Sequence, residues 1–204
     1  MPVTPILQKR THADWAEREQ EIAQYNQATP NRIKQMLLAL AQIDSHSSMD
    51  QLQHSLQTAT RAARSGASEE MIVAALCHDI SKLVSTENHA AVAAEILKPF
   101  VDHVTFEIIR THTDFQARYF RAHRGPSKDP RDKYRRQPWF RAACQFADEW
   151  DMPARDPSYD TYPLEYFWPM IEKIFSTPKA HRHISSLSVR LLHRLSASMR
   201  RLLY

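Results

Sequence analysis

The sequence places a histidine and an aspartate side by side at the end of an apolar run, at His78 and Asp79 in "AALCHDISKL". A lone His-Asp pair is weak evidence for a site, because such pairs occur by chance. Other potential metal ligands lie on or beside segments with an apolar face: His54, His89, His112 and Asp151. An isolated charge is costly to bury on such a face. A shared metal centre would satisfy all of these side chains together.

Imidazole and carboxylate groups form a mixed nitrogen and oxygen donor set that suits borderline metal ions. Adjacent His and Asp side chains at a helix end diverge, so one can serve a single ion while the other bridges two. A bridging carboxylate holds two ions about 3.5–4 Å apart. We therefore predict that Asp79 bridges two ions. His54 and Asp151 are expected to complete the site of one ion. His89 and His112 are expected to complete the site of the other.

Helical periodicity predicts the elements that must position these residues. Ser68 and the acidic residues after it predict the start of a helix over 68–83. Gly66 is well placed to end the preceding helix. Further helices are predicted over residues 11–27, 31–43, 51–66, 88–100, 104–115, 139–151 and 164–175. Pro30 is predicted to separate the first two of these. The Pro-containing stretches 121–138 and 152–163 are predicted as loops, the first being a polar surface loop or lid.

The composition indicates an all-α protein. Only 2 of the 204 residues are Gly, and hydrophobic residues make up 43% of the chain, which is enough for one domain with a real core. The net charge of +4 suits an anionic substrate but is too small by itself to imply nucleic acid. Cys77 and Cys144 lie in apolar stretches and are expected to be free thiols. The N-terminus lacks a signal-peptide pattern, and no apolar run is long enough to span a bilayer. We expect a soluble cytoplasmic protein.

Two basic segments allow more than one interpretation. Residues 180–204 carry one apolar stripe opposite a basic face, which fits either a membrane-surface helix or a helix that packs on the domain or mediates self-association. The basic stretch after Arg121 contains only one aromatic residue, Tyr134, so a stacking platform for nucleic acid is poorly supported. A basic loop over an anionic substrate, or a solvated loop, fits it better.

The ordered set of ligands resembles the HD-domain superfamily, whose signature is His, then His-Asp, then Asp, here His54, His78, Asp79 and Asp151. The additional His89 and His112 resemble the dinuclear branch of that superfamily. This branch includes mixed-valent diiron oxygenases, such as myo-inositol oxygenase and the phosphonate-cleaving oxygenases, and some phosphodiesterases. The finer resemblance is to proteins labelled "predicted HD phosphohydrolase". It is carried by "DQLQHSLQTATRA", "EEMIVAALCHDISKL", "NHAAVAAEILKPF", "HTDFQARYF" and "WDMPARDPSYDTYPLEYFWPMIEKIF".

The resemblance implies an all-α HD-domain helical bundle with a dinuclear metal site between core helices. The domain would span residues 31–178, with residues 1–30 as an N-terminal helical extension and residues 179–204 as a basic amphipathic C-terminal helix. Asp148 lies one helical turn before Asp151 and is the rival ligand. Asp151 is preferred because "WD" matches the family pattern and because "MPARDP" ends the helix.

Three functions follow from the resemblance. The first is a mixed-valent diiron oxygenase that uses O2 to cleave a C–P or C–C bond of a small hydroxylated anionic substrate, such as a hydroxyphosphonate. The alternative is a metal-dependent phosphohydrolase or phosphodiesterase, with Mn²⁺, Zn²⁺ or another divalent pair in place of Fe²⁺ and Fe³⁺. The third is a non-catalytic binding scaffold, which the loss of a ligand would support; all six ligands are present.

Candidate substrate contacts also follow from the resemblance. Asp79 and Lys82 are the predicted catalytic residues, and Lys82 matches a substrate-anchoring lysine, although a solvated Lys in a last helical turn is the alternative. Gln116 or Arg118 could reach an anionic group, although a surface Arg is common. His46 stands where related oxygenases place a residue that covers the iron. Ser81 replaces the family's usual Gly. "FQARYF" replaces the family's "FQGYYF", which leaves the substrate open.

Overall fold

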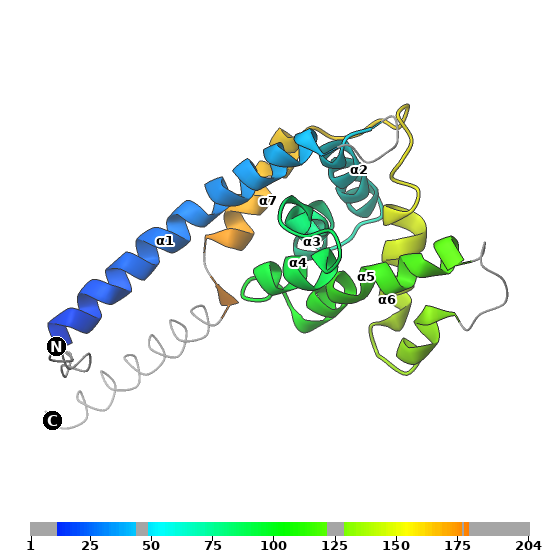
Figure 1. Cartoon of the computed structure of the whole chain (residues 1–204). Coiled ribbons are helices and arrows are strands. Elements are labelled where there is room, and N and C mark those ends of the chain that lie inside the picture. Colours follow the sequence, from blue (N-terminus) through cyan, green and yellow to red (C-terminus); the bar gives the residue numbers. More distant parts are fainter. Residues whose placement is uncertain (1–11, 44–48, 122–128, 177, 180–204) are drawn as a thin grey trace, which may run out of the picture.

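The computed structural model describes residues 12–43, 49–121, 129–176 and 178–179, and these residues form a helical bundle without a β-strand (Figure 1). The α-helices are α1 (His12–Ala39), α2 (Gln51–Arg64), α3 (Glu69–Cys77), α4 (His89–Leu97), α5 (His103–Arg121), α6 (Phe140–Gln145) and α7 (Leu164–Phe175). Short 3-10 helices lie at η1 (Leu40–Gln42), η2 (Ile80–Leu83) and η4 (Pro130–Tyr134). A π-helix, η5 (Phe146–Asp151), follows α6 directly. The predicted all-α class is confirmed.

Helix α3 forms the centre of the core. Its residues from Met71 to Cys77 are all buried, as expected for a helix that is apolar on every side. Helix α2 packs on α3, and α4 packs on α5, while α7 and the C-terminal half of α1 close the other side. Figure 1 shows α3 surrounded by these elements. The helix therefore delivers the residues that follow it, His78 and Asp79, into the interior.

The predicted end of α2 near Gly66 and the predicted start of α3 at Ser68 are confirmed by their caps. The helix predicted over 68–83 is shorter than expected, because α3 ends at Cys77 and the separate η2 follows. The Ser68 side chain accepts a hydrogen bond from the backbone N–H of Met71 at 3.3 Å and begins α3. Gly66 has a φ of 77°, a left-handed conformation that disfavours other residues, and it follows the last turn of α2. The two helices are thereby joined by a short connection.

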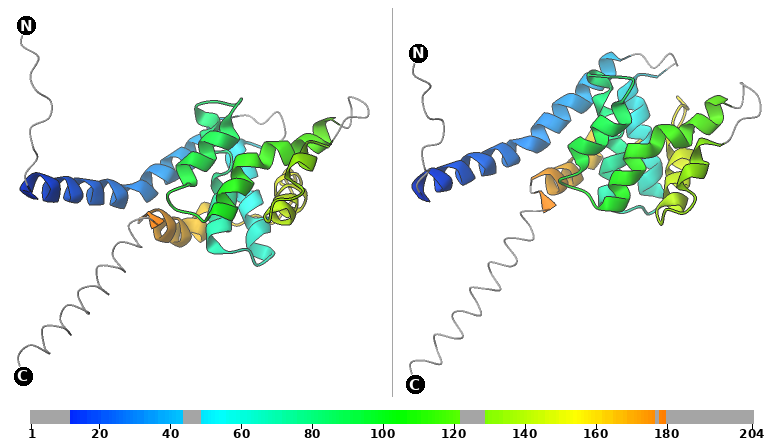
Figure 2. Two further views of the ribbon diagram at one scale, coloured as in Figure 1. Left: turned by 90° about the horizontal axis from the view of Figure 1, so that it is seen from below. Right: turned by 60° about the horizontal axis from the view of Figure 1, so that its bottom comes forward.

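The predicted break at Pro30 is wrong, because α1 continues through this residue. Proline removes a backbone donor and crowds the preceding turn. The carbonyl oxygen of Tyr25, five residues before Pro30, accepts from the Thr29 hydroxyl and from the Arg32 guanidinium, each at 3.0 Å. Pro30 itself is buried. These side-chain donors add hydrogen bonds across the turn that precedes Pro30, and Figure 2 shows the helix changing direction between its two halves.

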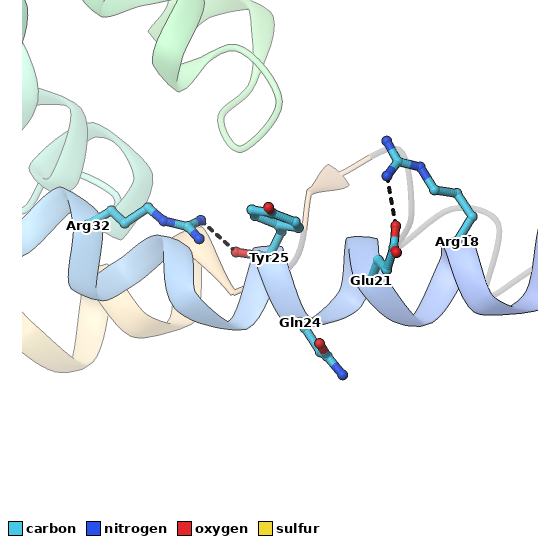
Figure 3. A pocket seen from close by; sticks show the side chains of 5 residues that line it. All are labelled: Arg18, Glu21, Gln24, Tyr25 and Arg32. Atoms are coloured by element: carbon cyan, nitrogen blue, oxygen red, sulfur yellow. Dashed lines mark hydrogen bonds and ion pairs between the residues drawn. The ribbon is translucent and has the colours of Figure 1, made fainter.

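The N-terminal half of α1 projects from the bundle (Figure 2). A shallow pocket of about 460 Å³ is lined there by Arg18, Glu21, Gln24, Tyr25 and Arg32 (Figure 3). Arg18 and Glu21 form an exposed ion pair at 2.8 Å, and Arg32 reaches back over the Tyr25 ring. Exposed pairs of this kind contribute little to stability. None of the candidate metal ligands lines this pocket.

In the described part of the stretch predicted as a polar surface loop, residues 129–138 are mostly exposed, and Arg131 is the buried exception. Arg131 in η4 is only 2% exposed and donates to the carbonyl oxygen of Phe115 in α5. It also donates to both carboxylate oxygens of Asp148. The guanidinium therefore joins η4, α5 and η5, and this pairing permits its burial. No helix among the described residues is both long and apolar enough to cross a membrane.

Candidate metal centre

The six predicted metal ligands converge in the interior from five places in the chain. Helix α2 supplies one, the turn after α3 supplies two, the start of α4 and the middle of α5 supply one each, and the last residue of η5 supplies the sixth. All six residues are buried: His54, His78, Asp79, His89, His112 and Asp151. Their exposed fractions are 0–1%, except that His89 in α4 is 9% exposed. Ionisable side chains are buried this fully only when they are paired or bind a metal.

Three residues form the first group of donor atoms. The Nε2 atoms of His54 and His78 lie 3.2 Å apart. Asp151 Oδ1 lies 3.2 Å from the Nε2 of His54 and 3.5 Å from that of His78. Asp79 Oδ2 adds a fourth donor, at 3.1 Å from His78 Nε2. Since metal–nitrogen and metal–oxygen bonds are near 2.0–2.2 Å, adjacent ligand atoms on one ion are separated by about 3 Å, so this group fits a single ion.

A second group lies on the other side of Asp79. The Nε2 atoms of His89 and His112 are 3.2 Å apart. They face the other carboxylate oxygen of Asp79, with His89 Nε2 at 3.1 Å and His112 Nε2 at 3.6 Å from Oδ1. His78, Asp79 and His112 also offer atoms that lie within 4.8 Å of one another. Asp79 is therefore the residue common to both groups, with one oxygen directed at each.

All four imidazoles are oriented by backbone carbonyl oxygens. The Nδ1 atoms of His54, His78, His89 and His112 lie 2.8, 2.8, 2.6 and 2.7 Å from the carbonyl oxygens of Ala154, Ala75, Thr86 and Ile109. A carbonyl oxygen only accepts, so each Nδ1 carries a proton and each ring directs its Nε2 toward the centre, where the unprotonated atom can bind a metal. This is the arrangement by which proteins fix metal-binding histidines.

Unpaired atoms at the centre provide a test of whether a metal fits. The Nε2 atoms approach to 3.2 Å in each group, and two unprotonated Nε2 atoms cannot hydrogen-bond to each other, so a proton or a metal cation must lie between them. Asp79 Oδ1 and Asp151 Oδ1 are fully buried without a hydrogen-bond partner. Buried polar atoms are rarely left unsatisfied. A cation between the Nε2 atoms and the unpaired oxygen of each group would satisfy all of them, so the donors present could hold two ions.

The electrostatics of the cluster also favour cations. Burial alone would raise the pKa of the Asp79 and Asp151 carboxyls, but contact with His78 and the neighbouring imidazoles holds both well below their usual range. Burial alone would lower the pKa of His78, but the two carboxylates raise it to about 10. Burial lowers the pKa of His112 despite its contact with Asp79. Without metal, the carboxylates of Asp79 and Asp151 and the imidazolium of His78 are therefore favoured at neutral pH.

Local backbone structure explains why adjacent His78 and Asp79 diverge. The α-helix ends at Cys77, and Asp79 has φ −106° and ψ 5°, outside the helical region. The chain then turns into η2, where the Ser81 hydroxyl donates to the carbonyl oxygen of His89 at 2.6 Å. Ser81, which replaces the expected Gly, thus fixes the start of α4. The turn directs His78 toward α2 and Asp79 toward both groups.

The position of Asp151 depends on η5 and on the loop that follows it. The π-helix ends at Asp151, and single π-turns are frequent at functional sites. The loop is fixed to α2: Gln57 bonds the backbone of Asp156 at both ends of its amide, and Tyr162 N donates to Thr60 at 3.0 Å. The rival Asp148 points elsewhere, since its carboxylate accepts from Arg131 and from the Tyr119 hydroxyl.

The structure places two of the four predicted substrate contacts beside the ligands. Lys82 Nζ donates to Asp79 Oδ2 at 2.6 Å, with 19% of its side chain exposed. Gln116 donates to Asp151 Oδ2 and so orients a ligand. Arg118 is not brought to the centre, because residues two positions apart on a helix lie on different faces and Gln116 occupies the inward face. The Arg118 side chain is 61% exposed and lies beside Asp129. His46 lies outside the described residues.

One residue of the site was missed from the sequence. Gln51 is buried, and its Nε2 donates to Asp79 Oδ2 at 2.7 Å. It precedes His54 by three residues, so both lie on one face of α2. That spacing was the available signal, but a glutamine at a helix start is common and carries no chemistry by itself.

Comparison with known families agrees with this geometry. Residues 52–151 match the family model described as "HD domain", and this range contains all six candidate ligands and ends at Asp151. No curated protein matches the chain. The match and the all-α fold agree with the resemblance drawn from the ordered His and Asp residues. The helices that bury this cluster therefore lie in the region that matches an HD domain, and this match supports the HD superfamily.

Proposed function

We propose that the chain is a dinuclear metalloenzyme that acts on a small anionic substrate. The first candidate function is that of a diiron oxygenase. The HD domain supports a metal-dependent enzyme. The observation that carries the proposal is the position of Asp79, whose two oxygens face separate pairs of imidazoles, at 3.1 Å from His78 and 3.1 Å from His89. A carboxylate in this position is suited to bridge two ions.

The donor set supports iron as the metal. Four imidazoles and two carboxylates suit iron, manganese or zinc, whereas magnesium prefers oxygen ligands. The first group offers His54, His78 and Asp151 together with one Asp79 oxygen, and the second offers His89, His112 and the other oxygen. The second group has fewer protein donors, so substrate would have more room to bind at its ion.

The surroundings of the second group support an anionic substrate. His89 and Lys82 are the partly exposed groups there, with 11% and 19% of their side chains accessible. The Lys82 ammonium is held at Asp79 and would attract a phosphonate, phosphate or carboxylate that approached this edge. On the inner side, the ring of Phe146 lies edge-on to His78 and His112 and keeps water from the imidazoles.

In the oxygenase reaction the protein's part is positioning. A mixed-valent iron pair would supply the redox chemistry that couples O2 to cleavage of a C–P or C–C bond. The chain's own residues hold the imidazoles in one tautomer, fix the carboxylates and direct the substrate anion with Lys82. The buried side of the site limits side reactions with water.

A phosphohydrolase is the second candidate, and the family match favours it, because HD domains are generally associated with metal-dependent hydrolysis. Two divalent ions would lower the pKa of a water molecule for attack on a phosphate ester. The same six ligands and Lys82 would take the same positions. A binding scaffold without catalysis is less well supported, since no ligand is missing.

Metal analysis combined with two assays separates the candidates. Protein prepared and partly reduced without oxygen is examined by Mössbauer and electron paramagnetic resonance spectroscopy, with and without hydroxyphosphonates. A mixed-valent diiron signal that changes with substrate, together with O2 uptake, supports the oxygenase. Two redox-inert ions with release of phosphate from an ester and no O2 uptake would establish the hydrolase instead.

A further inference from the structure

The two oxygens of Asp79 have very different surroundings. Oδ2 accepts two strong hydrogen bonds, from Gln51 Nε2 at 2.7 Å and from Lys82 Nζ at 2.6 Å. Oδ1 has no hydrogen-bond partner and faces only the imidazoles of His89 and His112. The protein therefore anchors the carboxylate through Oδ2, which also faces His78, and leaves Oδ1 without a hydrogen bond. Rotation of the carboxylate would break the hydrogen bonds at Oδ2.

Gln51 is built to hold this anchor. Its residue is 4% exposed, and its Oε1 accepts from Lys82 Nζ at 3.4 Å while its Nε2 donates to Asp79. The amide orientation is defined at both ends, because a carboxylate only accepts and an ammonium only donates. The backbone is fixed as well: Gln51 N donates to the carbonyl oxygen of Ile43, and Asp50 caps the helix start.

We propose that Gln51 is a positioning residue for the second metal ion. By holding Oδ2 and the Lys82 ammonium together, it sets the plane of the Asp79 carboxylate and keeps Oδ1 directed at His89 and His112. The first ion depends less on this contact, because Asp151 gives it a second carboxylate, held by Gln116. Outer hydrogen bonds of this kind typically change metal affinity by about 10–100-fold. The proposal rests on the dinuclear centre proposed above.

Gln51→Glu and Gln51→Met test the role. The Glu variant keeps the shape of the side chain but replaces the donor to Asp79 with an acceptor, while the Met variant removes both hydrogen bonds without adding charge. Mn²⁺ is titrated into the metal-free full chain, and binding is followed by calorimetry and by the decrease of the free-ion resonance signal. Both variants should bind the second ion about 10–100-fold more weakly and the first ion with little change.

Gln53→Glu is the matched control, because Gln53 is exposed on the same helical turn and receives the same change of charge. It should bind both ions as the wild type does. Thermal unfolding of the metal-free variants distinguishes a structural role for Gln51. A structural role would lower the stability of the fold and weaken the binding of both ions together. The proposal for Gln51 alone is wrong if the wild type binds two ions and both Gln51 variants keep both affinities. If the wild type binds only one ion, the dinuclear centre itself is wrong, and this role is wrong with it.

Discussion

His54 donates its Nδ1 proton to the carbonyl oxygen of Ala154, a hundred residues further along the chain, at a distance of 2.8 Å. The bond links α2 to the loop that follows Asp151, so one contact orients an imidazole and also holds the segment that carries a carboxylate ligand. His54 Nε2 in turn lies 3.2 Å from Asp151 Oδ1. The first group of donors thus assembles only when the two ends of the HD domain meet.

The position of Asp79 predicts a difference between the two carboxylates. Asp79→Asn should lower the content of both ions, because Asp79 offers an oxygen to each group of imidazoles. Asp151→Asn should lower the content of the first ion mainly, since the imidazoles that Asp151 contacts are those of His54 and His78, both in the first group. Plasma emission analysis of protein loaded with metal and then desalted provides the measurement. Equal losses in the two variants would contradict a bridging role for Asp79.

The second pair of imidazoles allows a separate prediction. The double variant His89→Ala and His112→Ala should retain one ion, because the donors around His54 and His78 remain intact. It should lose activity, since the ion with fewer protein ligands is the one available to substrate. Metal content and turnover are measured on the same preparation. If turnover persists with a single bound ion, the dinuclear mechanism is wrong.

The protonation of His78 predicts that metal binding depends on pH. The carboxylates of Asp79 and Asp151 raise the pKa of this buried imidazole to about 10 in the metal-free protein. Metal binding at His78 Nε2 must therefore displace a proton at pH 7–8, and the apparent affinity should rise about tenfold per pH unit below 10 for this one proton. Calorimetry in buffers of different ionisation enthalpy should detect the release of about one proton. No release would show that His78 is already neutral.

The raised pKa of His78 also affects the stability of the metal-free protein, which should fall with rising pH whereas the metal affinity should rise. A raised pKa means that the charged His78 stabilises the folded, metal-free protein fully below the ordinary imidazole pKa of about 6.5. That contribution is lost as the pH rises through about 10. Urea unfolding of the metal-free chain between pH 6 and 10 should show this decline.

The contact between Arg131 and Asp148 predicts a loss of stability without a loss of ligands. Arg131→Met removes bonds to Asp148 and to the Phe115 carbonyl, and should cost about 2–3 kcal/mol, less than a fully buried pair because the Asp148 side chain is 35% exposed. Urea unfolding measures the change. Arg136→Met, at an exposed arginine nearby, should alter stability by less than about 0.5 kcal/mol. Equal effects in the two variants would mean that the buried contact contributes little.

The pH dependence of this pair has a defined sign. Although burial opposes it, the Arg131 guanidinium lowers the pKa of Asp148. The pair therefore stabilises the fold above the ordinary carboxyl range and is lost as the pH falls through the lowered value. The difference between the wild type and Arg131→Met should be largest above about pH 4 and should shrink at lower pH.

The sequence by itself determined the helices and the donor types. Apolar periodicity, the Ser68 cap and Gly66 marked α2 and α3, since these signals act within a few residues. The order His54, His78, Asp79, Asp151 indicated the HD domain, because side-chain types and their order can be read directly from the sequence. The prediction at Pro30 was wrong because this buried proline is accommodated within α1, and the sequence does not reveal the packing around it.

Only the tertiary structure decided which neighbours act on those donors. Lys82 lies on Asp79, Gln116 lies on Asp151, and Arg118 points away, although all three were candidate substrate contacts on the sequence alone. Gln51 became part of the site only through the packing of α2 against the turn after α3. The physical reason is that each contact joins segments brought together by the burial of apolar faces, and spacing along one helix cannot specify where another helix will lie.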